Sequence, residues 1–469
     1  MGSIKSNIAY KGLLTFSNYI IGFVTFPYIT RILGPNNFGL VNYALNTIDY
    51  FLLFATLGIA TLGTREIATY RNDKEQIDTV FSKLVGVNFL FSIFALVALA
   101  LSIYFLRAFE EIRILLYIGS AKILFSVFAV EWYFTGTENF RYITIRSLAI
   151  KICYVALVFI CVKSSSDYVL YFILTIGSVV VNSIINFIYS QTCVNMKMGQ
   201  LFSKTYIGQN LKLGIYFIMS SMYITFNVMY LGIVSTNEQV GFYSTSVKLY
   251  FIILSLFSAY TNVMLPRMSS LVANSDKNQY IRRINQSYYL VVNTAIPLIV
   301  VSMFMAPGII EIVSGSGYEA SVLPMRILMP AMILVWLSQI IVFQGLIPLK
   351  KDKVLLITSF IGASSSILLN LLLTKKLGAM GSAIILVSCE VLVTSFYFYT
   401  IRRLNIIPLP RIKGIVEGLV RSIPYIIVCV LTLWFLDSHV LQTVVAGGVS
   451  VFVFGLVFKL KILPGLRKI

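Results

Sequence analysis

The sequence predicts an all-α polytopic membrane protein. Its 469 residues are 58% hydrophobic and only 12% charged, and its mean hydropathy is +0.87. Soluble domains have roughly 25% charged residues, so this chain cannot cover a globule of its length with a solvated surface. Helices are expected rather than a barrel, because barrel strands alternate polar and apolar residues and these apolar runs do not.

The apolar runs are long enough to span a bilayer. A transmembrane helix needs about 20 mostly apolar residues. Fourteen stretches meet this condition, near 8–30, 38–62, 84–106, 111–134, 143–163, 168–190, 213–234, 242–265, 286–310, 322–346, 354–374, 379–400, 418–436 and 441–460. We therefore expect about fourteen transmembrane helices.

Lysine and arginine predict the orientation of these helices. The two chain ends and the connections after even-numbered helices hold 28 of the 37 Lys and Arg residues. Positive charge gathers on the cytoplasmic side of membrane proteins, so both termini are predicted to be cytoplasmic. The net charge of +19 is then mostly a topology signal, and nucleic-acid binding is not indicated.

A faint internal repeat suggests two halves. Residues 36–51 can be laid over 238–253, which matches Gly39 with Gly241 and Asn46 with Lys248. The shift is six helices, so the two copies run in the same direction across the membrane. Parallel repeats are one transporter pattern, with the substrate site between the halves. We predict an N-terminal lobe over 1–196, a C-terminal lobe over 197–405 and a C-terminal helix pair over 406–469.

Polar residues inside the spans are candidates for a binding site. They are costly in lipid and should face the bundle or a water-filled cavity. In the second span, Gly39, Asn42, Asn46 and Asp49 recur at helical spacing. Small and amide residues also serve helix packing, so Asn46 and Asp49 can bind substrate or only pack.

The charged residues of the spans carry more information. Lys122 lies in the middle of its helix and Lys248 about two turns from the outer end of its own. A central lysine costs about 2.5–3.5 kcal/mol on insertion scales. Arg31 and Arg326 stand at outer helix ends, against the topological rule. Together, four inward-facing cations would bind an anion such as phosphate. The alternative is internal pairing, for which the candidate partners are Asp49, Glu131 and Glu390.

No catalytic or metal-binding residues are predicted. The sequence has no Walker A loop, metal-ligand cluster or serine elbow, and its one histidine is His439. The five cysteines have no CxxC spacing, which favours small packing residues over a metal or disulfide framework. We expect a protein that is not an enzyme and has no cofactor. A coupling ion, H⁺ or Na⁺, is left open.

Three stretches resemble a known family. They are ITRILGPNNFGLVNYA (29–44), VGFYSTSVKLYFIILSLFSAYTNVMLPRMS (240–269) and the region from Ala306 to Tyr399, with YEASVLPMRIL (318–328) and GLIPLKKDK (345–353). Their order and spacing are similar to those of the bacterial polysaccharide transporters, the lipid-linked oligosaccharide flippases. These belong to the multidrug/oligosaccharidyl-lipid/polysaccharide exporter superfamily. The match covers almost the whole chain.

The resemblance implies two six-helix lobes around a V-shaped cavity with alternating access. The implied substrate is an undecaprenyl-diphosphate-linked oligosaccharide of the O-antigen or capsule type, moved across the bacterial inner membrane. Its implied partners are membrane lipids, a polysaccharide polymerase and a chain-length regulator. Cationic cavity residues are thought to meet the diphosphate, a role that the matching motifs give to Arg31, Lys248 and Arg326. Lys122 lies outside these motifs and is a candidate because of its position alone.

The sequence departs from the family in the seventh span. Gly214 and Ile215 stand where the family often has a proline, and Asn227 stands near the usual place of an acid. This weakens any expectation of carboxylate-based ion coupling there. Two alternatives stay open: a cation-driven drug or small-molecule exporter of the same fold, and a membrane enzyme of polysaccharide assembly. The basic cavity residues argue against the first, and the missing catalytic pairs argue against the second.

Overall fold

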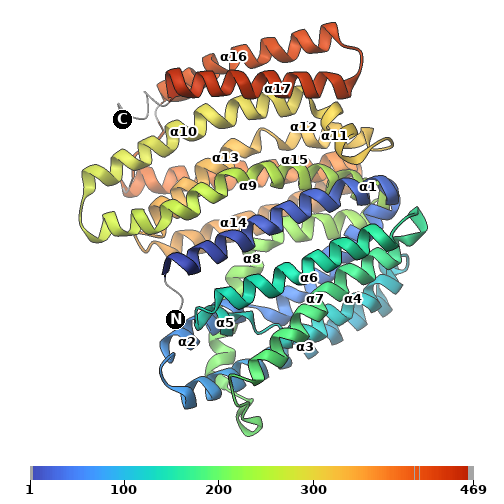
Figure 1. Cartoon of the computed structure of the whole chain (residues 1–469), viewed down its shortest axis with the longest axis vertical. Helices are drawn as coiled ribbons and strands as arrows, with labels where there is room; N and C mark the ends of the chain where they lie inside the picture. Colours follow the sequence, from blue (N-terminus) through green and yellow to red (C-terminus); the bar gives the residue numbers. More distant parts are fainter. Residues whose placement is uncertain (1–3, 406, 411, 463–469) are drawn as a thin grey trace. The chain divides into compact units, whose positions relative to one another are not determined.

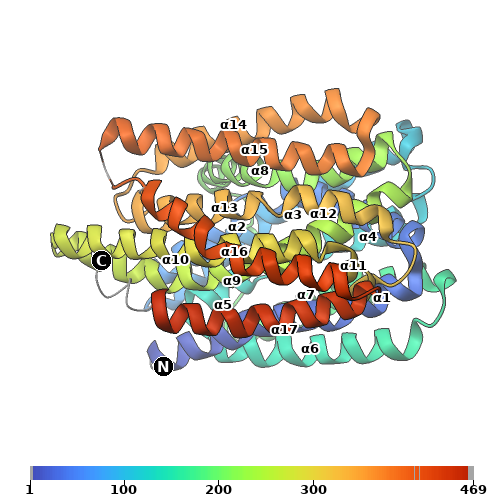
Figure 2. The same ribbon diagram turned by 90° about the horizontal axis from the view of Figure 1, so that it is seen from above.

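The computed structural model describes residues 4–405, 407–410 and 412–462. The regular elements in these ranges are helices, and no strand occurs among them (Figures 1 and 2). The predicted all-α membrane fold is confirmed. Contacts between Cα atoms divide the chain into two compact units, Met1–Gly241 and Phe242–Ile469, here called the first and second units.

The first unit is a helical bundle centred on α1, which contacts α3, α4, α6 and α8. Its helices, in chain order, are α1 (Ile4–Thr56), α2 (Ile59–Thr69), α3 (Lys74–Phe105), α4 (Arg113–Phe125), α5 (Glu131–Gly136), α6 (Phe140–Cys161), α7 (Tyr168–Gln191) and α8 (Lys204–Val234). The short 3₁₀ turns η1 (Arg107–Phe109), η2 (Ser126–Phe128), η3 (Ser165–Asp167) and η4 (Met198–Gln200) join them. Apolar residues of α2, α3 and α5 form a buried cluster around Phe81 and Trp132.

A single glycine separates the two halves of α1. Gly34 has φ 70° and ψ 172°, which is not helical, and Pro35 follows it. Only glycine adopts this left-handed region without a steric penalty. Figure 1 shows the ribbon reversing its direction there, between the dark blue and the lighter blue stretch. The predicted connection between the first two spans is therefore a turn of a few residues.

Beyond this turn, α1 packs closely against the start of α9 (Asn237–Ala273). A Cβ atom added to Gly39 would lie 1.7 Å from the carbonyl oxygen of Asn237. No real Cβ approaches another atom so closely, so only glycine fits at this position. The two backbones are thus in direct contact inside the first unit.

The second unit is built around α10 and α15. Its helices after α9 are α10 (Lys277–Phe304), α11 (Ala306–Ser314), α12 (Val322–Leu328), α13 (Ala331–Gln339), α14 (Asp352–Leu369), α15 (Lys375–Leu404), α16 (Ile412–Phe435) and α17 (His439–Val457). One 3₁₀ turn, η5 (Glu319–Ser321), and three π-helical segments, η6 (Ile340–Leu346), η7 (Asn370–Thr374) and η8 (Phe458–Ile462), complete it. Helix α10 contacts α13 and α16, α15 contacts α12, α13 and α14, and α17 contacts α11 and α16.

Polar side chains set the first residue of several helices. The capping residues are Asp73 at α3, Asn139 at α6, Ser203 at α8, Asp276 at α10 and Ser438 at α17. Each side-chain oxygen accepts a hydrogen bond from a backbone N–H of the first turn, which is the usual role of Asp, Asn and Ser there. The breaks between apolar runs are therefore encoded locally.

Each of the fourteen predicted spans overlaps a helix of the structure. Among the described residues, nine helices are long and apolar enough to cross a membrane, or ten if the bent pair Glu319–Leu328 and Ala331–Leu346 is one span. Of the nine, Asp352–Leu404 contains two predicted spans, and Ile21–Thr69 contains the second predicted span and the end of the first. The number of spans and the three predicted domains stay predictions.

The outer faces of these helices are suited to lipid. Phe94 and Phe105 of α3 are 63% and 71% exposed, and Trp434 of α16 is 79% exposed. Large apolar side chains in such numbers are rarely left in contact with water. The chain is therefore a multi-pass membrane protein.

Candidate functional site

Two of the predicted site residues are in direct contact in the first unit. The Lys122 ammonium of α4 donates to Oδ1 of Asp49 in α1, at 2.5 Å. The lysine side chain is 16% exposed and the aspartate side chain 44%. A lysine in a spanning helix needs such a partner, because an unpaired buried charge is strongly destabilising. The internal pairing considered for Lys122 is thus present, with Asp49 as its partner.

Asn46 lies near Asp49 on the same helix. Its amide donates to the carbonyl oxygen of Asn42 at 2.9 Å, and Asn42 donates to that of Phe38 at 2.7 Å. These bonds to the preceding turn hold both side chains against α1. Asn46 and Asp49 are three residues apart and share one face of the helix. The predicted polar stripe is therefore continuous along α1.

Arg31 stands three residues before the turn at Gly34, and its side chain is exposed. It belongs to the same unit as Asp49 and Lys122. The structure thus places four predicted site residues, Arg31, Asn46, Asp49 and Lys122, in the first unit. Whether any of them meets a substrate stays a prediction.

The other two predicted residues belong to the second unit. Lys248 is half-buried on α9, and Arg326 is exposed on α12. Nε of Arg326 donates to the carbonyl oxygen of Met303 at 3.0 Å. Met303 is in the last turn of α10, where carbonyl groups lack helical partners and a cation is favourable. Arg326 therefore caps α10; the sequence predicts its place at an outer helix end, but not the carbonyl group that it contacts.

Sequence reasoning missed a polar cavity inside the first unit. The cavity measures about 270 Å³ and is lined by Leu14 of α1, Glu131 of α5, Ser147, Ile150, Lys151 and Tyr154 of α6, and Ser178, Val179 and Asn182 of α7. Arg146, next to the lining, is 5% exposed, and its Nη2 lies 3.2 Å from Oε2 of Glu131.

The sequence does contain a pattern that indicates this cavity, which is the spacing of polar residues on two helices. Ser147, Lys151 and Tyr154 recur at intervals of three and four on α6, as do Ser178, Asn182 and Asn186 at intervals of four on α7. Such intervals place side chains on one helix face. The count of positive charges assigns Arg146 and Lys151 to the cytoplasmic side, and that assignment obscures the pattern.

The second unit contains a larger and almost entirely apolar cavity. It measures about 600 Å³. Its lining comes from α9, α10, α11, α13, α16 and α17, and includes Phe257, Leu298, Trp336, Val451 and Phe454. The helix pair α16 and α17, which lie side by side in Figure 1, supplies one wall. The volume of the cavity is in the range of ligand sites. Its apolar lining suits a hydrocarbon chain.

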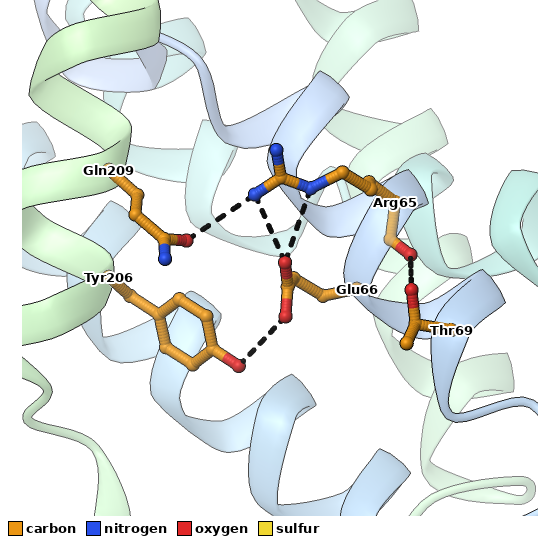
Figure 3. A network of polar contacts seen from close by, with 5 residues as sticks. All are labelled: Arg65, Glu66, Thr69, Tyr206 and Gln209. Carbon is orange, nitrogen blue, oxygen red and sulfur yellow. Dashed lines mark hydrogen bonds and ion pairs between the residues drawn. The ribbon is translucent and has the colours of Figure 1, made fainter.

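A polar network joins α2 to α8 in the first unit (Figure 3). The Tyr206 hydroxyl donates to Oε2 of Glu66 at 3.2 Å, and Nη2 of Arg65 donates to Oε1 of Glu66 at 3.1 Å. Gln209 accepts from the same Arg65 atom at 3.5 Å. Burial and, secondarily, the Glu66 charge raise the pKa of Tyr206 to about 12. Tyr206 precedes the seventh predicted span, so the network lies at a helix end.

Metal ligands do not gather in the described part of the chain. No three His, Cys, Asp or Glu residues there are close enough to hold a metal ion. The charged residues described above are instead arranged as ion pairs and hydrogen-bonded networks. The arrangement offers charge and hydrogen bonds, together with an apolar cavity, rather than a metal centre.

Comparison with protein families and curated proteins gives consistent matches. A family model described as "Polysaccharide biosynthesis protein" matches residues 4–272. An Escherichia coli K12 protein described as "Putative O-antigen transporter" is 24% identical over 413 residues, which is 85% of this chain and 97% of that protein. A Shigella dysenteriae protein with the same description is 27% identical over 407 residues, 85% of this chain and all of that protein.

Two solved structures share the fold. The lipid II flippase MurJ in an inward closed conformation superposes with a TM-score of 0.75, at 17% identity, over 96% of this chain and 99% of that one. An inward-facing multidrug MATE transporter of the MOP superfamily gives a TM-score of 0.59, at 13% identity, over 82% of this chain and 94% of that one. These likenesses show the fold alone.

Proposed function

Because this chain belongs to the polysaccharide biosynthesis protein family, we propose that it is a flippase for a lipid-linked oligosaccharide. It turns an undecaprenyl-diphosphate-linked repeat unit of an O-antigen, capsule or related polysaccharide from the cytoplasmic to the outer leaflet. It does so by alternating access and makes no covalent bond. The descriptions of the E. coli and Shigella relatives as O-antigen transporters support the substrate class.

The apolar cavity of the second unit carries this proposal. A flippase must move a polar headgroup through the membrane while the attached polyprenyl tail stays in apolar surroundings. A cavity of about 600 Å³ with an almost wholly apolar lining offers the tail an environment close to that of lipid. Moving the tail from bilayer to cavity then costs little, since both are apolar. A transporter of small polar solutes has no need of such a cavity.

The diphosphate headgroup is proposed to bind to the lysine and arginine side chains of the predicted site. Lysine binds phosphate as a point charge, and arginine supplies donors in a planar fork. In the first unit, Asp49 pairs with Lys122 while the site is empty, so this lysine is not left as an unpaired buried charge. The partly exposed Asp49 is replaced as partner when the diphosphate arrives. Arg31, Asn46, Lys248 and Arg326 are the further contacts that we propose for the headgroup.

Localisation follows from the same proposal. The chain would reside in the inner membrane of a bacterium with both termini in the cytoplasm, next to a polysaccharide polymerase and a chain-length regulator. Reporter fusions at Asn36 and Ser165 should then read as outside, and fusions at Lys74 and Lys351 as inside. A consistently inverted pattern would refute this orientation.

Deletion of the gene tests the function directly. The lipid fraction of the deletion strain should contain undecaprenyl-linked glycan that stays on the cytoplasmic face, where an added periplasmic glycosidase or lectin cannot reach it. Expression of the intact chain should restore exposure. If the amount and the sidedness of the lipid-linked glycan are unchanged by the deletion, the chain is not its flippase.

A further inference from the structure

An aromatic patch joins α1 to α8 beside the residues proposed to bind the diphosphate. Its members are Tyr50 of α1 and Phe226 and Tyr230 of α8, all in the first unit. The ring centroids of Tyr50 and Phe226 lie 6.2 Å apart. Those of Phe226 and Tyr230 lie 5.6 Å apart, and their ring planes are inclined by 24°. The three rings form one continuous patch, to which the transport described above gives no role.

Helix packing alone does not explain Tyr50. Tyr43, seven residues earlier on the same helix, is 1% exposed, and its hydroxyl donates to the carbonyl oxygen of Ala108 at 3.2 Å. The ring of a packing tyrosine is covered and its hydroxyl has a partner, as here. Tyr50 and Tyr230 are instead half-buried, and their hydroxyls are neither buried nor hydrogen-bonded within the described part of the chain. Both phenol groups can therefore contact a ligand.

The patch borders water rather than lipid. Asp49 directly precedes Tyr50, and its side chain is 44% exposed in the middle of a predicted span. A partly exposed carboxylate at this depth has to face water, because a charge in contact with hydrocarbon is costly. Asn46 precedes Tyr50 by four residues, so the two lie on one helix face. The polar stripe and the aromatic patch thus share the side of α1 that water reaches.

An aromatic ring flanked by polar groups suits a sugar. A pyranose ring presents polarised C–H bonds on its faces and hydroxyl groups around its edge. The C–H bonds stack on the electron-rich face of an aromatic ring, and the hydroxyl groups form hydrogen bonds with polar groups beside it. In this patch the three rings supply the faces. The two phenol groups and the Asn46 amide supply the polar atoms.

The position of the patch matches the covalent structure of the proposed substrate. In a lipid-linked oligosaccharide the first sugar is bonded directly to the diphosphate. The residues proposed to contact the diphosphate include Asp49 and Lys122. Tyr50 is the next residue after Asp49, so their Cα atoms are about 3.8 Å apart. A diphosphate bound at this ion pair would hold its first sugar beside the patch.

We propose that Tyr50, Phe226 and Tyr230 form a subsite for the first sugar of the lipid-linked oligosaccharide. The inference rests on the proposed flippase function and adds to it a selection of glycosylated over bare lipid diphosphate. Stacking recognises the ring as a whole rather than the pattern of its hydroxyl groups, so different hexoses and N-acetylhexosamines should be accepted. The subsite admits the carrier lipid only after a sugar has been attached.

The test is the binding of two lipid probes to the purified full chain, measured by native mass spectrometry. The probes are undecaprenyl diphosphate and undecaprenyl-diphosphate-linked N-acetylglucosamine, which differ by one sugar. We expect the wild type to bind the glycosylated lipid about tenfold more tightly, as two or three aromatic contacts would give. Tyr50→Leu and Phe226→Leu should bring the two affinities within about twofold of each other, without weakening the binding of the bare lipid. Tyr50→Phe retains the ring and should retain most of the difference.

Phe94→Leu is the control, because it removes an exposed ring from α3 of the same unit, and it should bind both lipids as the wild type does. If Tyr50→Leu fails to fold, Tyr230→Leu provides the same measurement from α8. A purely structural patch would weaken the binding of both lipids equally and leave the ratio of their affinities unchanged.

That result, or equal affinities of the wild type for the two lipids, would refute the subsite and leave the flippase function standing. A wild type that binds neither lipid would refute both. Binding of tetraphenylphosphonium that is lost in the Leu variants, with no difference between the two lipids, would assign the patch to organic cations instead.

Discussion

Lys122 and Asp49, which are 73 positions apart in the chain, form an ion pair that joins α4 to α1. The proposed substrate role and a purely structural role predict different double mutants. Lys122→Gln should abolish most glycan export under both. If the lysine only neutralises the aspartate, the double mutant Lys122→Gln with Asp49→Asn should recover glycan export, because it contains no unpaired buried charge.

Under the proposed role, the double mutant should stay inactive, since no cation remains for the diphosphate. Protein stability should fall by about 1–3 kcal/mol in either single mutant, as for a polar group that loses its partner. Export is measured as surface glycan, normalised to the amount of protein in the membrane. Recovery of export in the double mutant would remove Lys122 from the substrate site.

Substitutions of Lys248 on α9 test whether export depends on the charge of this side chain or on its shape. Lys248→Arg keeps the charge and should retain partial export, whereas Lys248→Gln should lose most of it. Lys277→Gln, which changes an exposed lysine at the start of α10, is the control and should export normally. Equal activity of the Arg and Gln variants of residue 248 would show that its charge is not needed.

The apolar cavity of the second unit can be filled from one helix. Gly447 of α17 lines it, and an added Cβ there would meet no atom within 4 Å. Gly447→Phe should occupy the space of the polyprenyl tail and reduce export at least tenfold. The neighbouring Gly448 also has open space around it, but it is exposed and does not line the cavity. Gly448→Phe is thus matched in size and helix position, and a loss of export equal to that of Gly447→Phe would argue against a tail site.

The network of Figure 3 predicts a pH dependence of stability. The neutral Tyr206 hydroxyl donates to Glu66, and the pKa of Tyr206 is raised from 10.0 to about 12. Its contribution to stability is therefore fully present below pH 10 and lost as the pH rises through 12. Tyr206→Phe should destabilise the protein by about 1 kcal/mol at pH 8, the low end for a bond to a charged group, because the site is partly exposed. The unfolding temperatures of wild type and variant should converge as the pH rises from 10 to about 12. A difference that stays constant from pH 8 to 11.5 would contradict this account.

Much of the architecture could be predicted because membrane helices are encoded locally. A run of about 20 apolar residues indicates a transmembrane helix without any knowledge of its tertiary contacts. Capping residues such as Asp73 and Ser203 mark the first residues of helices. The turn at Gly34 could also be predicted, since a glycine followed by a proline disfavours the continuation of a helix. The number of spans is harder to read, because α1 and α15 each continue through a glycine turn without a regular break.

The site could be predicted less well because its partners are remote in sequence. The sequence shows that Lys122 has a high free-energy cost of insertion into the membrane. Its pairing with Asp49, however, depends on how α4 packs on α1. The capping of α10 by Arg326 likewise needs the position of Met303. Arg146 lies near the start of the span predicted at 143–163, and its charge is counted with the cytoplasmic side because positive charges near helix ends normally mark that boundary. Its burial against Glu131 is a tertiary property.

The contact of Gly39 with the Asn237 backbone has a consequence for how the gene can vary. Gly39 and Asp49 lie on one stretch of helix. Gly39 contacts the backbone of Asn237, and Asp49 pairs with Lys122. A single inserted or deleted codon between them would rotate one anchor by about 100° relative to the other. Natural variants of this segment should therefore differ by substitution alone, whereas the connection at residues 163–167 can change in length.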